Sequence, residues 1–271
     1  MARVALPESR IRTRRRRRRV LLAALVVFLL CLLSGGSVYF AQTPYLRIAR
    51  IDISGAQTLS STTVAALAAQ ELSGSYLGLF PRDNIFLYPK GAIARDIIAA
   101  LPVVKEVRVG AKNFTAITVT VTERTPKALW CGEAVASSTS CMFLDEDGVA
   151  YAPTLDLSGE PYIRYFGVLS TSTPPQFTTP AEFRSLTALV DTIAQNQSIT
   201  SVEGVTVDHN KDVRLRFTDG FELLFPLNAD GGDVYERLRL ALSAEPFSSH
   251  PLSDFEYLDL RFGDKLYYKL K

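Results

Sequence analysis

The sequence predicts an α+β protein that is attached to a membrane by a single N-terminal helix. Three observations support this fold class: an uncharged apolar stretch near the N-terminus, a β-α-α-β-β pattern after it, and a run of short strands with two helices in the second half. They divide the 271 residues into a basic tail (1–19), a transmembrane helix (20–41), an α+β domain (42–126) and a strand-rich domain (127–271).

The transmembrane helix is predicted from Val20 to Ala41, within a stretch that has no charged residue between Arg19 and Arg47. At about 1.5 Å per residue its 22 residues span roughly 33 Å, enough to cross a hydrocarbon core of about 30 Å. Basic residues flanking a span stay on the cytoplasmic side, so the rest of the chain is expected outside the cytoplasm. The flanking run consists of Arg14, Arg15, Arg16, Arg17, Arg18 and Arg19.

A cleaved signal peptide is the alternative to a retained span. The purest apolar part covers only residues 20–33 and is followed by small residues at 34–37, which is the secretory pattern. Apolar character resumes at residues 38–41, where Tyr39 suits the membrane interface, and this favours a retained span. Either alternative carries the C-terminal part across the membrane.

Charge is distributed unevenly along the chain. Residues 1–19 contain nine arginines and one glutamate, whereas the remainder holds 21 basic and 27 acidic residues. The mildly acidic remainder argues against nucleic acid as its partner. Arginines beside an apolar span are better explained by topology and by attraction to anionic lipids than by nucleic-acid binding.

The cysteines point to an oxidising compartment. Cys31 lies in the predicted span, whereas Cys131 and Cys141 flank a loop of small residues between two apparent strands and could form a disulfide. Free thiols are the alternative. A zinc site is disfavoured because the chain has only His209 and His250, and neither has ligand spacing.

The α+β domain is predicted element by element. A strand covers residues 46–54, and a helix follows from about residue 59 to Leu72 with Val64, Leu67 and Ala68 on one apolar face. Residues 76–88 are apolar and irregular.

A second helix opens near Pro89, carries Ile93, Ile97 and Leu101 on one face, and ends at Pro102. Alternating residues then predict strands at 107–111 and 117–122. Two helices covering one face of a three-stranded sheet would complete the domain.

The strand-rich domain begins with paired strands at 128–130 and 142–144. Its further strands are predicted at 149–151, 162–166, 202–207, 213–217, 221–225, 255–260 and 265–270, and its helices at 183–195 and 233–244. On the second helix we expect Tyr235, Leu238 and Leu242 to share the apolar side. The proline- and threonine-rich segment 170–180 is the best candidate for a mobile loop.

Five segments in the same order resemble the FtsQ/DivIB family of bacterial cell-division proteins. They are the strand 46–55, the step LPVVKEVRV at 101–109, the signature ITVTVTERTPKA at 117–128, the hairpin LDEDGV at 144–149 and the closing strand YLDLRF at 257–262. The resemblance covers nearly the whole chain. The two extracytoplasmic cysteines and the loop 170–180 lie outside the family pattern.

The resemblance implies a POTRA domain at 42–126 and an FtsQ-type domain after it. It also implies a bitopic scaffold at the division septum that binds FtsB/FtsL-type partners and other division proteins, without cofactor, metal or small-molecule substrate. The residues that carry the family signatures are Glu123, Arg124, Pro126, Asp145, Asp147 and Gly148.

No enzyme constellation stands out. Asp145, Glu146 and Asp147 could form an acid/base pair or a cation site, but a turn explains each of them better. Glu123 and Arg124 are better explained as a conformational ion pair at a strand end than as a catalytic pair.

The last strand is expected to form a sheet edge, which offers unpaired backbone groups to a partner strand. The candidate partner-binding residues are Lys265, Leu266, Tyr267, Tyr268, Lys269 and Leu270. An ordinary edge whose lysines prevent aggregation is the alternative, and the family resemblance favours partner binding.

Two other functions remain open at the level of the sequence. One is a POTRA-bearing chaperone or transport component that receives extended polypeptides, and the other is a secreted enzyme that modifies the cell wall. Localisation at midcell would separate the scaffold from the first, and turnover of wall fragments would indicate the second.

Overall fold

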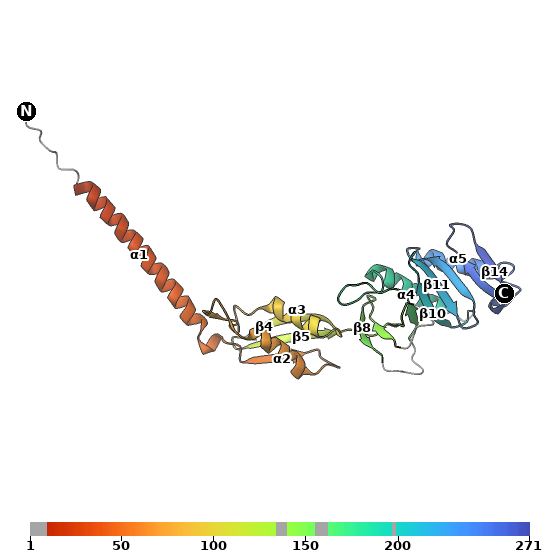
Figure 1. The fold of residues 1–271 in the computed structure, drawn as a ribbon, viewed down its shortest axis with the longest axis horizontal. Coiled ribbons are helices and arrows are strands. Elements are labelled where there is room, and N and C mark those ends of the chain that lie inside the picture. Colours follow the sequence, from red (N-terminus) through yellow and green to blue (C-terminus); the bar gives the residue numbers. More distant parts are fainter. Residues whose placement is uncertain (1–9, 134–139, 155–161, 197–198) are drawn as a thin grey trace, which may run out of the picture. The chain divides into compact units, whose positions relative to one another are not determined.

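The computed structural model describes residues 10–133, 140–154, 162–196 and 199–271. The protein is a mixed α+β chain with one long N-terminal helix and a large strand-rich sheet (Figure 1). It forms two compact units, the first made of residues 1–98 and 106–122 and the second of residues 99–105 and 123–271.

Helix α1 (Arg10–Ala41) includes the predicted span and extends N-terminally into the arginine run. By length and composition its part from Arg16 to Ala41 could cross a membrane, and its apolar side chains are exposed. Residues 34–37 are helical, and the hydroxyls of Ser34 and Ser37 donate to carbonyls three residues earlier. The small residues therefore do not interrupt the helix.

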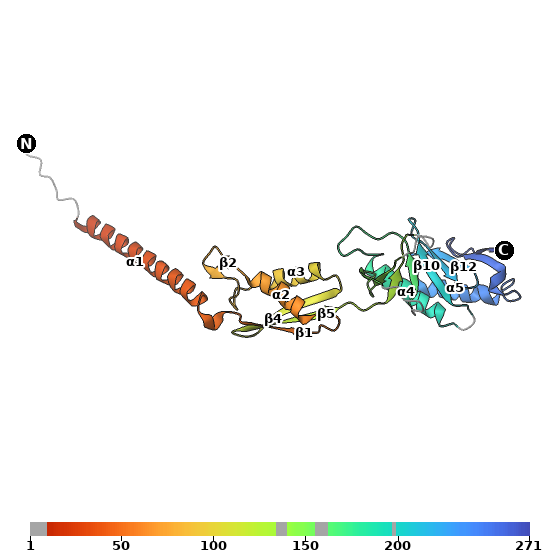
Figure 2. The same cartoon turned by 60° about the horizontal axis from the view of Figure 1, so that its bottom comes forward.

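The first unit has the predicted β-α-α-β-β order. Its elements are β1 (Arg50–Ser54), α2 (Ser61–Leu72), α3 (Lys90–Ala100), β4 (Val104–Asn113) and β5 (Ala116–Glu123). The sheet order is β1-β5-β4, with β1 parallel to β5. Figure 2 shows α2 and α3 on one side of this sheet. The predicted apolar faces meet there, and the fully buried residues are Val64, Ala68, Ile93, Ile97, Ile117 and Val119.

Two predictions for the first unit need correction. The strand expected from residue 46 begins only at Arg50, because Leu46 is buried at the end of the 3-10 helix η1 (Pro44–Leu46). The segment 76–88, expected to be irregular, contributes to a short hairpin of β2 (Ser75–Tyr76) and β3 (Phe80–Pro81). Strands of two residues give no periodicity that sequence analysis could detect.

The second unit is built on one nine-stranded sheet with the order β14-β13-β12-β11-β10-β9-β6-β7-β8. Its strands are β6 (Ala128–Trp130), β7 (Met142–Leu144), β8 (Ala150–Pro153), β9 (Arg164–Phe166), β10 (Val202–Val207), β11 (Asp212–Phe217), β12 (Glu222–Pro226), β13 (Phe255–Asp259) and β14 (Tyr267–Leu270). The pairing mixes both directions, since β9 is parallel to β6 and β10, and β12 is parallel to β13.

Helices α4 (Pro180–Ala194) and α5 (Gly231–Ser243) pack against each other and against the sheet. Thr179 and Glu182 form a capping box at the start of α4, which fixes where that helix begins. The buried face of α5 carries Val234, Leu238 and Ala241 rather than the predicted Tyr235 and Leu242, which are only partly buried. The apolar face is thus rotated by about one residue from the prediction.

The loop 170–180, predicted to be mobile, makes several contacts with the second unit. Gln176 donates its backbone N–H to the hydroxyl of Ser170 and forms a β-bridge with Val149. Ala150 donates to the carbonyl of Pro175, and the ring of Phe177 is buried in the core. Because buried and edge backbone groups need partners, this loop completes the β8 side of the sheet.

Candidate functional site

Strand β14 is one edge of the nine-stranded sheet, as the sequence predicts. It pairs antiparallel with β13, and all four of its residues are exposed. Within the described residues, no strand lies beyond it in the sheet order. Lys265 and Leu266 precede the strand in a turn, so the strand is shorter than the predicted 265–270.

The backbone of β14 alternates between its partner and the open side. The N–H of Lys271 donates to the carbonyl of Asp254 on the β13 side. Because successive backbone groups of a strand face opposite directions, Lys269 and Tyr267 share this direction. The N–H and C=O groups of Tyr268 and Leu270 therefore face away from β13, toward the open edge.

Two tyrosines fix the strand to the rest of the unit in different ways. Tyr268 packs edge-on against Phe247 and Phe255, with ring centroids 5.5 and 6.0 Å away, and Phe255 is fully buried. Tyr267 packs against Phe262 at 5.3 Å. Both tyrosines keep nearly half of their surface exposed. The prediction that they point to opposite faces agrees with these separate contacts, and Tyr268 is the one that meets the core.

Polar contacts hold the segment that leads into β14. Arg237 on α5 donates to the carbonyl of Leu260 at 3.1 Å and to that of Lys265 at 3.2 Å, so it bridges the end of β13 and the turn before β14. On the strand, Lys269 lies 2.5 Å from the carboxylate of Glu256, which raises the lysine pKa. These contacts fix the position of an exposed strand.

The opposite edge of the sheet is less open. The bond from Ala150 to Pro175 and the bridge between Val149 and Gln176 cover the beginning of β8. Proteins commonly protect a sheet edge with such a loop, or with a proline like Pro153 at its end. Of the two edges in the described part of the chain, β14 is the better template for another strand.

Arg124 and Asp145 form a buried ion pair that joins two of the sequence signatures. A guanidinium N–H of Arg124 donates to Asp145, and its Nε donates to the carbonyl of Pro102 at 3.1 Å. The other carboxylate oxygen of Asp145 accepts the N–H groups of Asp147 and Val149, both at 2.9 Å. Asp145 is thus used inside the turn, which is the interpretation that the sequence favoured over an acid/base or cation site.

The neighbouring signature residues complete this turn. Lys105 lies 2.5 Å from Glu146 and 2.7 Å from Asp147. Gly148 has a left-handed φ of +75°, and an added Cβ would lie 2.9 Å from the ring of Phe183. Only glycine meets both conditions.

Pro126 is exposed and lies between β5 and β6, which belong to different sheets. A strand does not continue through it, in keeping with its missing N–H. Glu123 is the last residue of β5. Its neighbour Arg124 makes an ion pair with Asp145.

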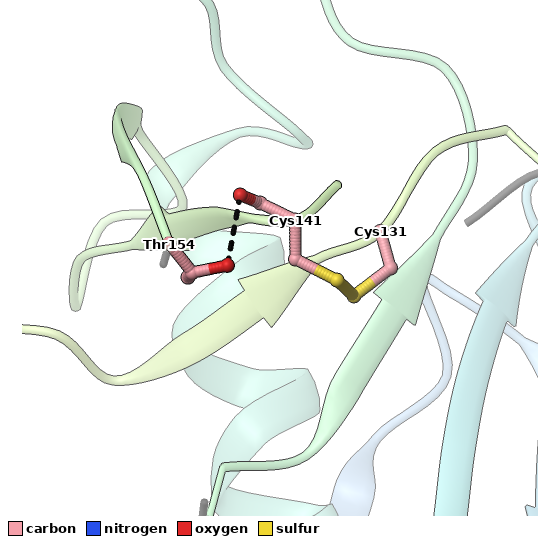
Figure 3. Close-up of a disulfide and its surroundings, with 3 residues drawn as sticks. All are labelled: Cys131, Cys141 and Thr154. Carbon is pink, nitrogen blue, oxygen red and sulfur yellow. Dashed lines mark hydrogen bonds between the residues drawn. A yellow bond between two sulfur atoms is a disulfide. The ribbon is translucent and has the colours of Figure 1, made fainter. Parts of the chain in front are cut away.

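Cys131 and Cys141 form a disulfide at the ends of β6 and β7 (Figure 3). The backbone N–H and the hydroxyl of Thr154 both donate to the carbonyl of Cys141, at 2.8 and 3.2 Å. Cys131 is fully buried beside Phe166. A buried disulfide in the second unit is consistent with an oxidising compartment.

The two histidines lie on exposed loops. His209 lines a cavity of about 660 Å³ beside the start of α4, and His250 lies 3.6 Å from Asp254. Two charged groups that line the cavity pair with each other, since Lys211 donates to Glu182 at 2.9 Å and holds the pKa of that carboxyl below its ordinary value. In the residues that the structure describes, no group of three or more His, Cys, Asp or Glu could hold a metal ion.

The six arginines, Arg14 to Arg19, lie within α1 and continue directly into the apolar part of the helix. The side chains of residues 16–19 are exposed. The arrangement places positive charge at one end of the candidate span, where contact with lipid headgroups is available.

Sequence analysis missed the residues that position the edge strand. Arg237 belongs to a helix whose polar face looks ordinary, and Phe247 lies in a turn without periodicity. Neither carries a local signal, because their contacts depend on how α5 and β13 pack.

No protein-family model matches the sequence, and no curated protein matches it.

Proposed function

We propose that the protein is a membrane-anchored scaffold of the bacterial division machinery. It captures a strand of an FtsB/FtsL-type partner on β14 and so controls when septum formation proceeds, without carrying out covalent chemistry. Helix α1 anchors it in the plasma membrane with the arginine tail in the cytoplasm and both units outside. The POTRA-like first unit contributes to recruitment at the septum.

The observation that carries this proposal is the geometry of the β14 edge. Tyr268 and Leu270 direct backbone groups away from β13, and their strand is already ordered by Arg237 and by aromatic packing. A partner strand that pairs there gains main-chain hydrogen bonds while this chain loses little conformational freedom. The sequence signatures resembling the FtsQ/DivIB family suggest which partner.

Side chains along the edge indicate the composition of that strand. Because side chains alternate along a strand, Tyr267 and Lys269 lie on one face of β14, and Tyr268 and Leu270 lie on the other. Tyr267 packs against Phe262, and the apolar side chains on both faces are partly exposed. Lys265, just before the strand, is exposed as well. A partner strand with alternating apolar side chains and a carboxylate near the lysines fits this surface.

Leu270→Pro tests the edge directly. Its N–H faces away from β13, so proline removes one donor from the open side and leaves the pairing with β13 intact. We expect Leu270→Pro to lose co-purification of the FtsB/FtsL-type pair, while Leu270→Ala keeps it. Circular dichroism should show that both variants are folded. Full partner binding by a folded Leu270→Pro protein would refute strand addition at β14.

Proline at Tyr267 or Tyr268 would not isolate the open edge. The N–H of Tyr267 faces β13, and the ring of Tyr268 packs on Phe255, so either change would also disturb the fold. Proline at Leu270 removes a donor from the open edge without these effects on the fold.

A fluorescent fusion of the full chain tests the place of action. A division scaffold concentrates at midcell in constricting cells, whereas a chaperone or transport component of the envelope distributes evenly. Even distribution would refute the division role without bearing on the geometry of β14.

A further inference from the structure

Four large apolar side chains of the first unit are exposed around its junction with α1. They are Tyr45 (82% exposed), Leu77 (92%), Leu79 (49%) and Phe86 (68%), and we call them the apolar collar. They come from three separate segments: η1, the β2–β3 hairpin and the turn after β3. Exposed apolar residues gathered on a folded domain mark a surface that contacts something other than water.

Hydrogen bonds tie the collar to the end of α1. The side chain of Asn84, which is buried, donates to the carbonyl of Ala41 at 2.9 Å. Gln42 donates to the carbonyl of Leu79 at 3.1 Å, within the collar itself. The loops that carry the collar are thus fastened to the last residues of the apolar helix.

The connection between α1 and β1 is held as well. The N–H of Ile85 donates to the carbonyl of Leu46 at 2.8 Å, and Arg47 makes an ion pair with Asp83 at 2.7 Å. The collar and the end of α1 are therefore joined through several contacts rather than through a free linker.

The hairpin tip exposes leucine at a conformational cost. Leu77 and Gly78 both have left-handed φ values, +53° and +72°, and the N–H of Leu79 donates to the carbonyl of Tyr76. Turns of this kind normally carry Asn, Asp or Gly at the first central position. Leu77 is almost fully exposed, so its side chain contributes little packing to the fold in return for the positive φ. This points to a role in contacting something outside the protein.

Basic and aromatic residues surround the collar. Arg82 lies over the ring of Tyr76 at 5.3 Å, and Lys90 lies over that of Tyr88 at 5.2 Å. Tyr88 is buried, whereas Tyr76 is 36% exposed. An exposed tyrosine with a basic neighbour, such as Tyr76 with Arg82, is typical of the interface between membrane and water.

Phe114 adds a further exposed aromatic ring at this end of the sheet. It lies in the turn between β4 and β5, and Arg50 at the start of β1 pairs with Ala116 just after that turn. The β4–β5 turn thus lies near the segment that follows α1.

We infer that the apolar collar inserts into the lipid interface of the membrane that α1 crosses, on the side of the folded units. This inference rests on the membrane anchoring in the proposed function. The segment 20–41 uses about 33 Å on a hydrocarbon core of about 30 Å, so Ala41 lies at its boundary. The interfacial layer beyond it is only about 5–8 Å thick on each side. Groups bonded directly to residues 41 and 42 fall within that layer.

Insertion holds the first unit against the membrane through the collar as well as through the covalent link. The apolar tip enters the acyl boundary, while the flanking Arg82 and Lys90 meet headgroup phosphates. A second copy or another protein covering the collar is the competing occupant, and the test separates it.

Spin-label accessibility in nanodiscs of phosphatidylethanolamine and phosphatidylglycerol tests this inference on the full chain. A nitroxide is attached to Leu77→Cys in a Cys31→Ala background, without reductant so that the disulfide stays closed. Ser61→Cys is the matched control, because Ser61 is exposed in the same unit beyond the far end of β1. Native Cys31, exposed on α1, provides the reference for lipid.

We expect the ratio of oxygen to nickel-chelate collision rates at Leu77 to exceed that at Ser61 severalfold and to approach the ratio at Cys31. Equal ratios at Leu77 and Ser61, with a lipid-type ratio at Cys31, would overturn the inference and leave the anchor intact. Low accessibility of Leu77 to both reagents would also overturn it, because a protein would then cover the tip. A water-type ratio at Cys31 would refute the anchoring and the inference together.

Discussion

Arg124 and Asp145 are expected to contribute strongly to the stability of the second unit. Their side chains are only 8% and 1% exposed. Arg124→Met removes the charge and keeps much of the apolar stem, so the carboxylate of Asp145 stays buried without its counter-ion. The change therefore removes the ion pair together with the hydrogen bond to the Pro102 carbonyl.

The size of the effect follows from the groups left behind. Breaking a buried ion pair by removing one partner costs about 3–5 kcal/mol. The N–H groups of Asp147 and Val149 still bind the carboxylate, which argues for the lower end, about 3 kcal/mol. Loss of the bond to the Pro102 carbonyl adds about 1 kcal/mol. In the Arg124→Met background, the further change Asp145→Asn should cost less than it does in the wild-type protein. The difference, which is the coupling free energy of the pair, should be about 2 kcal/mol.

Trp130 provides the assay. It is the only tryptophan, it lies in β6, and its indole N–H donates to the carbonyl of Gly167 at 2.8 Å. Urea unfolding of the detergent-solubilised full chain, followed by tryptophan fluorescence, therefore reports on the second unit. With a slope of about 2 kcal/mol per molar urea, a loss of about 4 kcal/mol should lower the Arg124→Met midpoint by about 2 M.

The control is Arg239→Met, which breaks the pair of Arg239 with Glu236 on α5. Both partners are more than half exposed, so the midpoint should not move measurably. Equal midpoints for Arg124→Met and the wild type would refute the reasoning. Strict additivity of Arg124→Met and Asp145→Asn would refute the pairing.

Three further expectations use the same fluorescence. Replacing Cys131 and Cys141 together by alanine should lower the unfolding free energy by about 3 kcal/mol, because the bond closes a loop of ten residues. Gly148→Ala should lower the unfolding free energy by about 2–5 kcal/mol, because its positive φ strains an alanine and the added Cβ would clash with Phe183. Gly263 also has a positive φ, but no atom lies within 4 Å of an added Cβ, so Gly263→Ala should cost only about 1–2 kcal/mol. Burial raises the pKa of Asp259, but hydrogen bonds from a neighbouring arginine lower it more, so its folded value lies below its unfolded value. Its contribution is complete above about pH 4 and is lost as the pH falls further, and Asp259→Asn should therefore show a shallower loss of stability in acid.

Much of the fold could be predicted because its elements carry their own patterns. Helix α3 shows Ile93 and Ile97 at a spacing of four, and β5 alternates valine and isoleucine with threonine. The corrections concern elements without such periodicity. The hairpin β2–β3 has two residues in each strand, and the loop 170–180 is ordered by partners in another segment.

The edge position of the last strand could be anticipated, because a chain end often completes a sheet. Its precise start and its orientation could not. The turn at Lys265 is fixed by Arg237 from a helix, and the direction of the Leu270 N–H depends on the register with β13. Both properties arise from packing between distant segments, which a single sequence does not display.

The signature residues and the proposed binding edge have different physical roles. Arg124, Asp145 and Gly148 are committed to an internal turn, so their role is in the fold of the second unit. The open side of β14, by contrast, consists of backbone groups at Tyr268 and Leu270, which any non-proline residue supplies. In the proposed strand capture, side chains select the partner, whereas the pairing itself comes from the backbone. Only a change directed at the backbone, such as Leu270→Pro compared with Leu270→Ala, separates a protein that folds from one that also binds.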